Sequence, residues 1–180
     1  MPQTKQTATT AAMLYLICGK IAAGKSTFAK QLSEQSGTVL ISEDFWLASL
    51  YSGQIASLLY SGQIASLEDY ARCSGLLRTA MAPHIMGLLQ AGVSVVLDFP
   101  SNTLATRAWA RELIEQAGVA HELHYLDVAD ELCKARLHAR NASGDHPFET
   151  TEAQFDLFSR YFVAPQESEG FHVIRHQIRE

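Results

Sequence analysis

Four residues near the N-terminus have the types and the spacing that bind phosphate. Gly19 is followed, after four residues, by Gly24, Lys25 and Ser26 in the stretch GKIAAGKST. In this P-loop pattern, backbone amides surround phosphate oxygens, the lysine reaches the outer phosphates and the hydroxyl binds Mg²⁺. The pattern therefore predicts a site for ATP and Mg²⁺. Its residues are Gly19, Lys20, Ile21, Ala22, Ala23, Gly24, Lys25, Ser26 and Thr27.

The segments on either side of this loop supply the structure that the pattern needs. Residues 13–18, MLYLIC, form a short apolar run suited to a buried strand, and residues 25–34 have the pattern of a helix. A helix that begins at the loop directs its unpaired amides and its positive dipole end toward the phosphates. Glycine at positions 19 and 24 permits backbone angles and a close approach that a side chain would block.

Two aspartates follow predicted strands. Asp44 comes shortly after the strand predicted at residues 38–42, and Asp98 lies near the end of the one at 93–99. Ligands bind at the carboxyl ends of parallel strands, where Asp44 could orient an acceptor hydroxyl and take its proton. Asp98 has the pattern of a carboxylate that holds Mg²⁺ opposite Ser26. The alternative for each aspartate is to cap the following helix.

Other polar residues near these strand ends have more than one possible role. Glu43, directly before Asp44, is the alternative base. Thr103, rather than Asn102, is the expected cap of the helix that follows. Arg107, one turn into that helix, faces either the cleft or the solvent.

Two arginines share one face of a later predicted helix. Arg136 and Arg140 are four residues apart in KARLHARN, so both guanidinium groups can reach one polyphosphate. The turn-rich stretch NASGDHP follows. This arrangement predicts a mobile lid whose arginines neutralise charge during phosphoryl transfer. The alternative is an ordinary solvated basic face.

The rest of the chain alternates between strand and helix patterns. Alternation of this kind predicts crossover units and a parallel sheet with helices on both faces, the α/β class. We expect further strands at 121–128 and 171–178. We expect helices at 67–90 with a break near Pro83, at 103–116 with Gly118 as the cap, at 129–140 and at 151–162.

Length and composition are those of one ordinary domain. The chain has 180 residues, of which 47% are hydrophobic and 18% charged. We expect a flexible polar tail at 1–12 and a single domain at 13–180. No apolar run reaches the roughly 18 residues that span a bilayer, and no secretory signal fits, so we expect no membrane partner and a cytoplasmic location. Three widely spaced cysteines predict reduced thiols.

The net charge of −5 argues against a nucleic-acid partner, because proteins that grip a polynucleotide usually present a basic face.

One segment is a perfect tandem duplication. The stretch LYSGQIASL occupies residues 50–58 and again residues 59–67. Two copies of nine residues are too few and too short for a solenoid. At about 100° per residue, matching side chains of the two copies would point to opposite faces of one helix. We interpret the second copy as a tolerated insertion, with an altered substrate lid or a homodimer contact as alternatives.

Together these motifs resemble the small P-loop kinases, the group that includes polynucleotide kinase, zeta toxins, chloramphenicol phosphotransferase and gluconate kinase. The likeness runs from LICGKIAAGKST through ISEDFW and VVLDFPSNT to CKARLHARN. It implies the P-loop nucleoside triphosphate hydrolase fold, with a doubly wound five-stranded parallel sheet in the order 2-3-1-4-5. It also implies that Lys25 and Ser26 bind ATP and Mg²⁺, that Asp44 is the base, and that Arg136 and Arg140 contact phosphates.

We therefore expect an ATP- and Mg²⁺-dependent kinase that phosphorylates a hydroxyl of a small molecule. Polynucleotide kinase-like members often carry an arginine three residues after the base, where this chain has Leu47. That difference weakens the alternative of a nucleic-acid 5′-hydroxyl kinase. A second alternative is an ATP-binding switch or ATPase without an acceptor. Phe45 and Trp46 favour an acceptor with an aromatic or aliphatic part, unless both side chains belong to the core.

Overall fold

The computed structural model describes residues 11–51, 65–143 and 150–179. Almost all of the predicted tail, and most of the duplication at 50–67, lie outside the described residues. The elements are β1 (Met13–Cys18), α1 (Lys25–Ser33), β2 (Thr38–Ser42), α2 (Glu43–Tyr51), α4 (Ala65–Gln90), β3 (Ser94–Pro100), α5 (Leu104–Ala117), β4 (Ala120–Val128), α6 (Asp130–Ser143), α7 (Glu152–Arg160), the 3₁₀ turn η1 (Glu167–Glu169) and β5 (Val173–Ile178).

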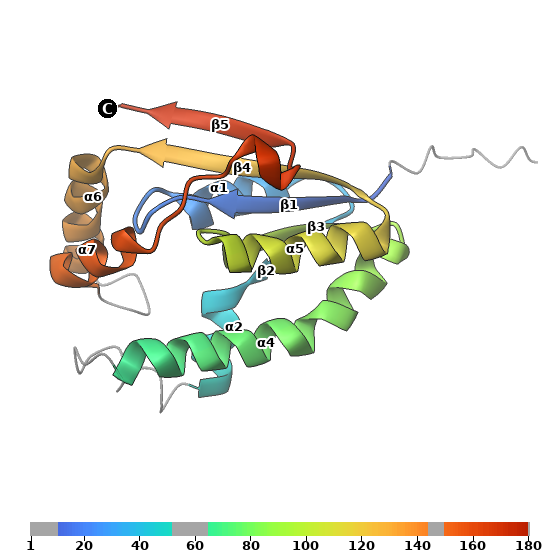
Figure 1. Ribbon diagram of the computed structural model, residues 1–180, viewed down its shortest axis with the longest axis horizontal. Coiled ribbons are helices and arrows are strands. Elements are labelled where there is room, and N and C mark those ends of the chain that lie inside the picture. Colours follow the sequence, from blue (N-terminus) through green and yellow to red (C-terminus); the bar gives the residue numbers. More distant parts are fainter. Residues whose placement is uncertain (1–10, 52–64, 144–149, 180) are drawn as a thin grey trace, which may run out of the picture.

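The five strands form one sheet in the order β2-β3-β1-β4-β5, and every neighbouring pair is parallel. The sheet order predicted from the family resemblance is therefore confirmed. The register pairs Ser42 at the end of β2 with Asp98 on β3. Because all strands run the same way, their carboxyl ends meet at one edge, which Figure 1 shows facing α6 and α7.

Two apolar cores lie on opposite faces of the sheet. The side chains of β1 alternate between them: Leu14 and Leu16 face one core, and Tyr15 and Ile17 face the other. The first core is completed by α2, α4 and α5, and the second by α1, α6 and α7. Figure 1 shows α4 and α5 together on one side of the sheet. The result is a three-layer α/β architecture, which agrees with the predicted fold class.

Two helices differ from the sequence expectation. The break predicted near Pro83 does not occur: α4 is one continuous helix of 26 residues that contains Pro83. Proline removes one helical hydrogen bond, but Pro83 lies on the exposed side while Met81, Ile85 and Leu89 stay buried on the other. Packing of that apolar stripe outweighs the lost bond. The second difference is α2, which was not predicted as a helix.

Helix α5 begins and ends at the residues that the sequence indicated. The Thr103 hydroxyl accepts a hydrogen bond from the amide of Thr106 and forms a capping box with it. Gly118 ends the helix in the left-handed conformation, with φ of 63°. The expected caps at both ends are confirmed.

Within the described part of the chain, no helix has both the length and the apolar character required to cross a membrane.

Candidate active site

The P-loop connects β1 to α1 in a conformation that depends on small residues. A Cβ atom at Gly19 would lie 3.0 Å from the carbonyl oxygen of Leu126 and 3.3 Å from the Cβ of Ala23. Gly24 has φ of 99° and Ala22 has φ of 59°, both in the left-handed region. A larger residue at position 19 would therefore push the loop away from β4.

The N-terminus of α1 is free to receive an anion. Its N-cap residue, Gly24, provides no side-chain cap, and its first turn has no acidic residue. The first amides of a helix have no acceptor inside the helix, and they lie at the positive end of its dipole. Lys25, Ser26 and Thr27, which form this first turn, line the cavity. These donors fit the phosphates of a nucleotide.

Asn102 holds the start of the P-loop in place. Its Oδ1 accepts a hydrogen bond from the amide of Gly19, and its Nδ2 donates one to the carbonyl of Gly19, both at 2.9 Å. Its own carbonyl accepts from the amide of Val163 at 2.9 Å. Asn102 therefore joins the end of β3 to the P-loop and to the segment after α7. The sequence analysis considered this residue only as a helix cap.

Lys25 lies inside the loop that it belongs to. Its ammonium donates to the backbone carbonyl of Lys20 at 2.7 Å. Burial lowers the pKa of Lys25, and the nearby carboxylates of Asp98 and Asp44 act in the opposite direction. Both predicted functional aspartates are therefore close enough to Lys25 to interact with its charge.

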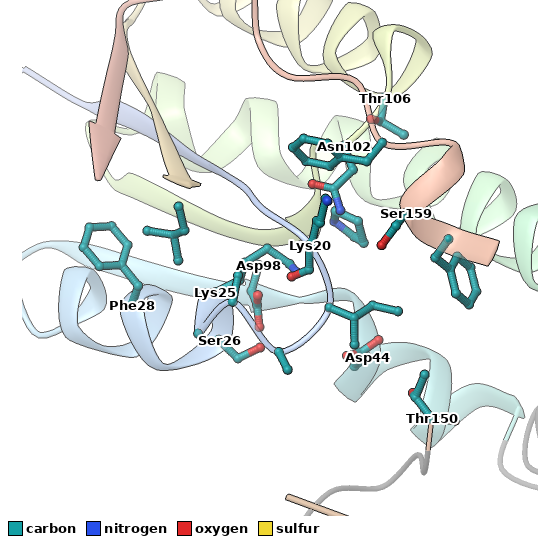
Figure 2. Close-up of a pocket in the computed structure, with 18 of the residues that line it drawn as sticks. Lys20, Lys25, Ser26, Phe28, Asp44, Asp98, Asn102, Thr106, Thr150 and Ser159 are labelled. Carbon is teal, nitrogen blue, oxygen red and sulfur yellow. The ribbon is translucent and has the colours of Figure 1, made fainter. Parts of the chain in front are cut away.

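Ser26 and Asp98 both line the cavity beside Lys25, as Figure 2 shows. The Ser42 hydroxyl donates to Asp98 at 3.4 Å. The described residues contain no group of three or more His, Cys, Asp or Glu side chains that could hold a metal on their own. Mg²⁺ usually takes only one or two protein ligands and obtains the rest from phosphates and water. The pair therefore fits a Mg²⁺ ion that binds together with a nucleotide.

The two acidic residues in the first turn of α2 have different environments. Glu43 is fully buried, and it accepts hydrogen bonds from Tyr70 at 3.2 Å, from Arg78 at 3.1 Å and from Ser74. Burial raises the pKa of Glu43, and its hydrogen-bond donors oppose that shift. Asp44 instead lines the cavity. Of these two carboxylates, Asp44 is therefore the one placed to meet a substrate.

Both arginines of the predicted lid line the cavity. Arg136 approaches the carbonyl of Ala23 in the P-loop at 3.5 Å, and Arg140 approaches the hydroxyl of Thr150 at 3.5 Å. Burial lowers the pKa of Arg140, which the carboxylate of Asp44 partly offsets. Helix α6 thus carries both guanidinium groups on the face that the spacing predicted; Arg136 reaches the P-loop, and Arg140 lines the cavity beside Thr150.

Lys20, the second residue of the P-loop, is tied to the start of α6. Its ammonium makes an ion pair with Asp130 and lies 5.9 Å above the ring of Phe162. Figure 2 shows Lys20 directed toward Asn102. The loop, the first turn of α6 and the segment after α7 therefore meet at one point.

Arg107 corrects the sequence analysis, which placed it in the cleft or in the solvent. The side chain is fully buried and pairs with Glu169 through two hydrogen bonds of 2.6 and 2.9 Å. It also donates to the carbonyls of Ser101 at 3.1 Å and Val163 at 2.8 Å. The guanidinium thus uses its donors to fasten the C-terminal segment to α5. Its partner is 62 residues away, which local spacing could not indicate.

One cavity of about 1160 Å³ connects the P-loop with Asp44, Asp98 and the two arginines of α6. Its walls come from the P-loop, from Asp44, from one face of α4, from the end of β3 with the start of α5, and from α6 and α7. Phe45 and Trp46 are not among its lining residues, and their exposed fractions are 65% and 37%. These aromatic residues therefore belong neither to the core nor to the cavity wall.

A family model described as an AAA domain matches residues 14–165. No curated protein matches the sequence.

Solved structures share the fold at low identity. A candidate kinase from Chloroflexus aurantiacus matches with a TM-score of 0.70 and 17% identity, over 93% of this chain and 85% of that one. Kti12 from Chaetomium thermophilum in complex with ADP-AlF3 matches with a TM-score of 0.66 and 15% identity, over 91% and 88%. The APS kinase of Mycobacterium tuberculosis in complex with AMPPNP and APS matches with a TM-score of 0.55 and 17% identity, over 93% and 88%.

Proposed function

Because the chain belongs to the AAA domain family and has the fold of the small P-loop kinases, we propose that it is an ATP- and Mg²⁺-dependent kinase that phosphorylates a hydroxyl of a small molecule. The observation that carries the proposal is the extent of the cavity. It continues from the P-loop past Asp44 to the wall formed by α4 and α5. Its volume of about 1160 Å³ exceeds the roughly 300–1000 Å³ of ordinary small-molecule sites, which leaves room for a second substrate beside the nucleotide.

Each residue of the site has a part in this reaction. The P-loop amides and Lys25 hold the outer phosphates, and Arg136 and Arg140 neutralise charge on the group in transfer. Asp44 orients the acceptor hydroxyl and takes its proton as the new oxygen–phosphorus bond forms and ADP leaves. A Mg²⁺ ion held by Ser26 and Asp98 would supply further charge neutralisation when bound.

The test is ADP release measured with a panel of hydroxyl-bearing metabolites and antibiotics. A kinase releases ADP faster in the presence of its acceptor, and the phosphorylated product appears in equal amount. The Asp44→Asn variant should still bind Mg-ATP but lose transfer by roughly 100- to 10,000-fold, the usual contribution of a positioned general base. Glu43→Gln is the matched comparison on the neighbouring residue, and full transfer by Asp44→Asn would exclude Asp44 as the base.

A nucleotide-binding switch or ATPase is the second candidate, because one structural neighbour, Kti12, is not named as a kinase. Such a protein would hydrolyse ATP at a rate that no acceptor changes. The same panel therefore separates the two candidates.

A nucleic-acid 5′-hydroxyl kinase is the remaining alternative. The net charge of −5 argues against it. Including an oligonucleotide with a free 5′-hydroxyl in the panel tests it directly, since its phosphorylation would replace the small-molecule proposal.

A further inference from the structure

One wall of the cavity carries a cation that the nucleotide site does not need. Tyr70, Ser74 and Arg78 follow one another at four-residue intervals along α4, and all three line the cavity. The hydroxyls of Tyr70 and Ser74 are directed to Glu43. Of these three residues, Arg78 is thus the one with N–H donors that Glu43 does not use.

The guanidinium of Arg78 is only partly satisfied. A guanidinium has five N–H donors, and within the described residues Arg78 makes one hydrogen bond, from Nη2 to Glu43 at 3.1 Å. Its Nε is buried without a partner among those residues. The side chain keeps 19% exposure while it lines the cavity, and it lies 5.9 Å from the ring centre of Trp109. A contact with the face of an aromatic ring stabilises the cation without using its N–H donors.

The hydrogen bond from Arg78 to Glu43 ties α4 to α2, but this structural role does not explain the remaining donors of the guanidinium. Glu43 already receives two hydroxyl hydrogen bonds, so it does not depend on Arg78 alone. Arg78 does stabilise the buried Glu43 carboxylate by its charge, and a leucine or methionine would leave that carboxylate without a cation. This contact nevertheless uses only one donor of the guanidinium, and an anion in the cavity would accept hydrogen bonds from donors that Glu43 does not use.

The wall across from α4 also favours negative charge. Thr103 and Thr106 at the start of α5 line the cavity together with Asn102. They form the N-terminal turn of a helix of 14 residues; their capping box already uses the amide of Thr106, and the positive end of the helix dipole still favours negative charge nearby. In the part of the cavity between α4 and α5, the lining residues that the structure describes thus include a cation and a helix N-terminus.

We propose that Arg78 binds a carboxylate or phosphate group on the acceptor molecule while the hydroxyl of the same molecule lies at Asp44. The inference rests on the proposed kinase function and names the class of acceptor: a small hydroxylated anion. Arg78 contacts the residue adjacent to Asp44, so the hydroxyl and the anionic group of the acceptor are close together in the molecule. A planar guanidinium suits both carboxylate and phosphate, and the experiment distinguishes them.

The first arm of the test measures anion binding without any transfer reaction. The chain has two tryptophans, so in a Trp46→Phe background the fluorescence reports on Trp109, next to Arg78. With Mg-AMPPNP filling the phosphate site, the protein is titrated with acetate, with inorganic phosphate and with sulfate. We expect a saturable change whose Kd rises roughly 10- to 100-fold in Arg78→Gln, the effect of losing a charge-assisted hydrogen bond. Acetate and phosphate report the two possible anions separately.

Control variants keep this arm decisive. Arg72→Gln removes the same charge from an exposed position on the same helix, outside the cavity lining, and should leave anion binding unchanged. Arg78→Lys keeps the charge but loses the planar fork, and should give an intermediate Kd. If Arg78→Gln does not fold, Arg78→Lys is judged by the same criterion. No saturable anion binding in the parent protein, or equal binding in the Arg78 variants, overturns the proposal.

The second arm uses pairs of acceptors that differ only in charge, such as glycerate and glycerol, or gluconate and glucose. The proposal expects ADP release to be stimulated by an acid and not by its neutral partner. Arg78→Gln should raise the KM of that acid while the KM of ATP stays the same. Stimulation by a neutral compound alone would overturn the anion inference and leave the kinase function standing. Anion binding at Arg78 without stimulation by any acceptor would leave the anion site standing and remove the kinase function.

Discussion

Asn102→Ala offers the sharpest test of how the site is built. The side chain of Asn102 makes two hydrogen bonds of 2.9 Å to the backbone of Gly19, a buried residue at the start of the P-loop. Alanine removes both bonds at once and leaves the amide and the carbonyl of Gly19 without these partners. The backbone carbonyl of Asn102, which accepts from Val163, remains in the variant. The perturbation is therefore confined to the contact with the P-loop.

The expected loss of stability follows from these two bonds. Each neutral hydrogen bond contributes about 1 kcal/mol, and an unsatisfied buried group costs about 1–3 kcal/mol. Asn102 lines the cavity, so water can reach the vacated place and replace part of the bonding. We therefore expect the free energy of unfolding to fall by about 2–3 kcal/mol, and the Tm to fall by roughly 4–12 °C for a chain of this size. The affinity for AMPPNP should fall as well, because the loop is no longer held in its binding conformation.

Urea denaturation and titration with AMPPNP measure both effects. The urea midpoint should fall without a change in the m value, which would indicate the same unfolding reaction. Asn102→Asp is the informative companion, since it keeps an acceptor for the amide of Gly19 but places a negative charge beside a carbonyl oxygen and the nucleotide phosphates. It should bind AMPPNP more weakly than the alanine variant. If the free energy of unfolding falls by less than about 0.5 kcal/mol in Asn102→Ala, the range of ordinary surface substitutions, then Asn102 does not hold the start of the P-loop in place.

Further predictions concern Asp98, Lys25 and the duplicated segment. Asp98→Asn should raise the Mg²⁺ concentration needed for nucleotide binding, and titration of AMPPNP at several Mg²⁺ concentrations would show no such change if Asp98 were only a capping residue. Burial lowers the pKa of Lys25 in the folded protein below the usual 10.5 of the unfolded chain. Between the folded and the unfolded pKa, the unfolded chain binds more protons, so the free energy of unfolding without nucleotide rises with pH. Urea unfolding of Lys25→Met across this pH window should lack that part of the rise, while its ATP binding is weakened; an unchanged pH profile would contradict the burial of a charged lysine. Deletion of residues 59–67 should leave the fold and ATP binding intact, as circular dichroism and AMPPNP titration can establish, whereas failure to fold would mean that both copies are structural. Light scattering on the same deletion variant tests the alternative of a homodimer contact through the duplication, which predicts a smaller particle for the variant than for the parent protein.

Local patterns predicted the parts of the fold that depend on neighbouring residues. The apolar run of β1 and the caps Thr103 and Gly118 appear where the sequence placed them, because burial and capping act within a few residues. Pro83 misled the analysis, since the buried stripe on the far side of α4 decides whether that helix continues. Helix α2 was missed because its sequence runs into the duplication, which has no clear helical signal of its own.

The contacts that organise the site come from distant parts of the chain. Asn102 is 83 residues from Gly19, and Arg107 is 62 residues from Glu169. No spacing rule links such pairs, because only the parallel sheet and the C-terminal segment bring them together. Arg78 could not be predicted for the same reason. An arginine in a long helix is usually solvated, and Arg78 lies on the cavity wall only because α2 and α5 pack beside α4. The motif residues could be predicted, and the residues that hold them could not.

The pairing of Arg107 with Glu169 sets an order of events during synthesis of the protein. The ribosome completes β1, the P-loop and β3 well before it adds Glu169, so Arg107 has to wait for its carboxylate. A lone guanidinium is costly to bury, so we expect the start of α5 to settle on the sheet only after Glu169 has been added. Val163, which bonds to both Arg107 and Asn102, also arrives late. A nascent chain thus carries its complete phosphate-binding motif well before it contains Val163 and Glu169, which support that motif through Asn102 and Arg107.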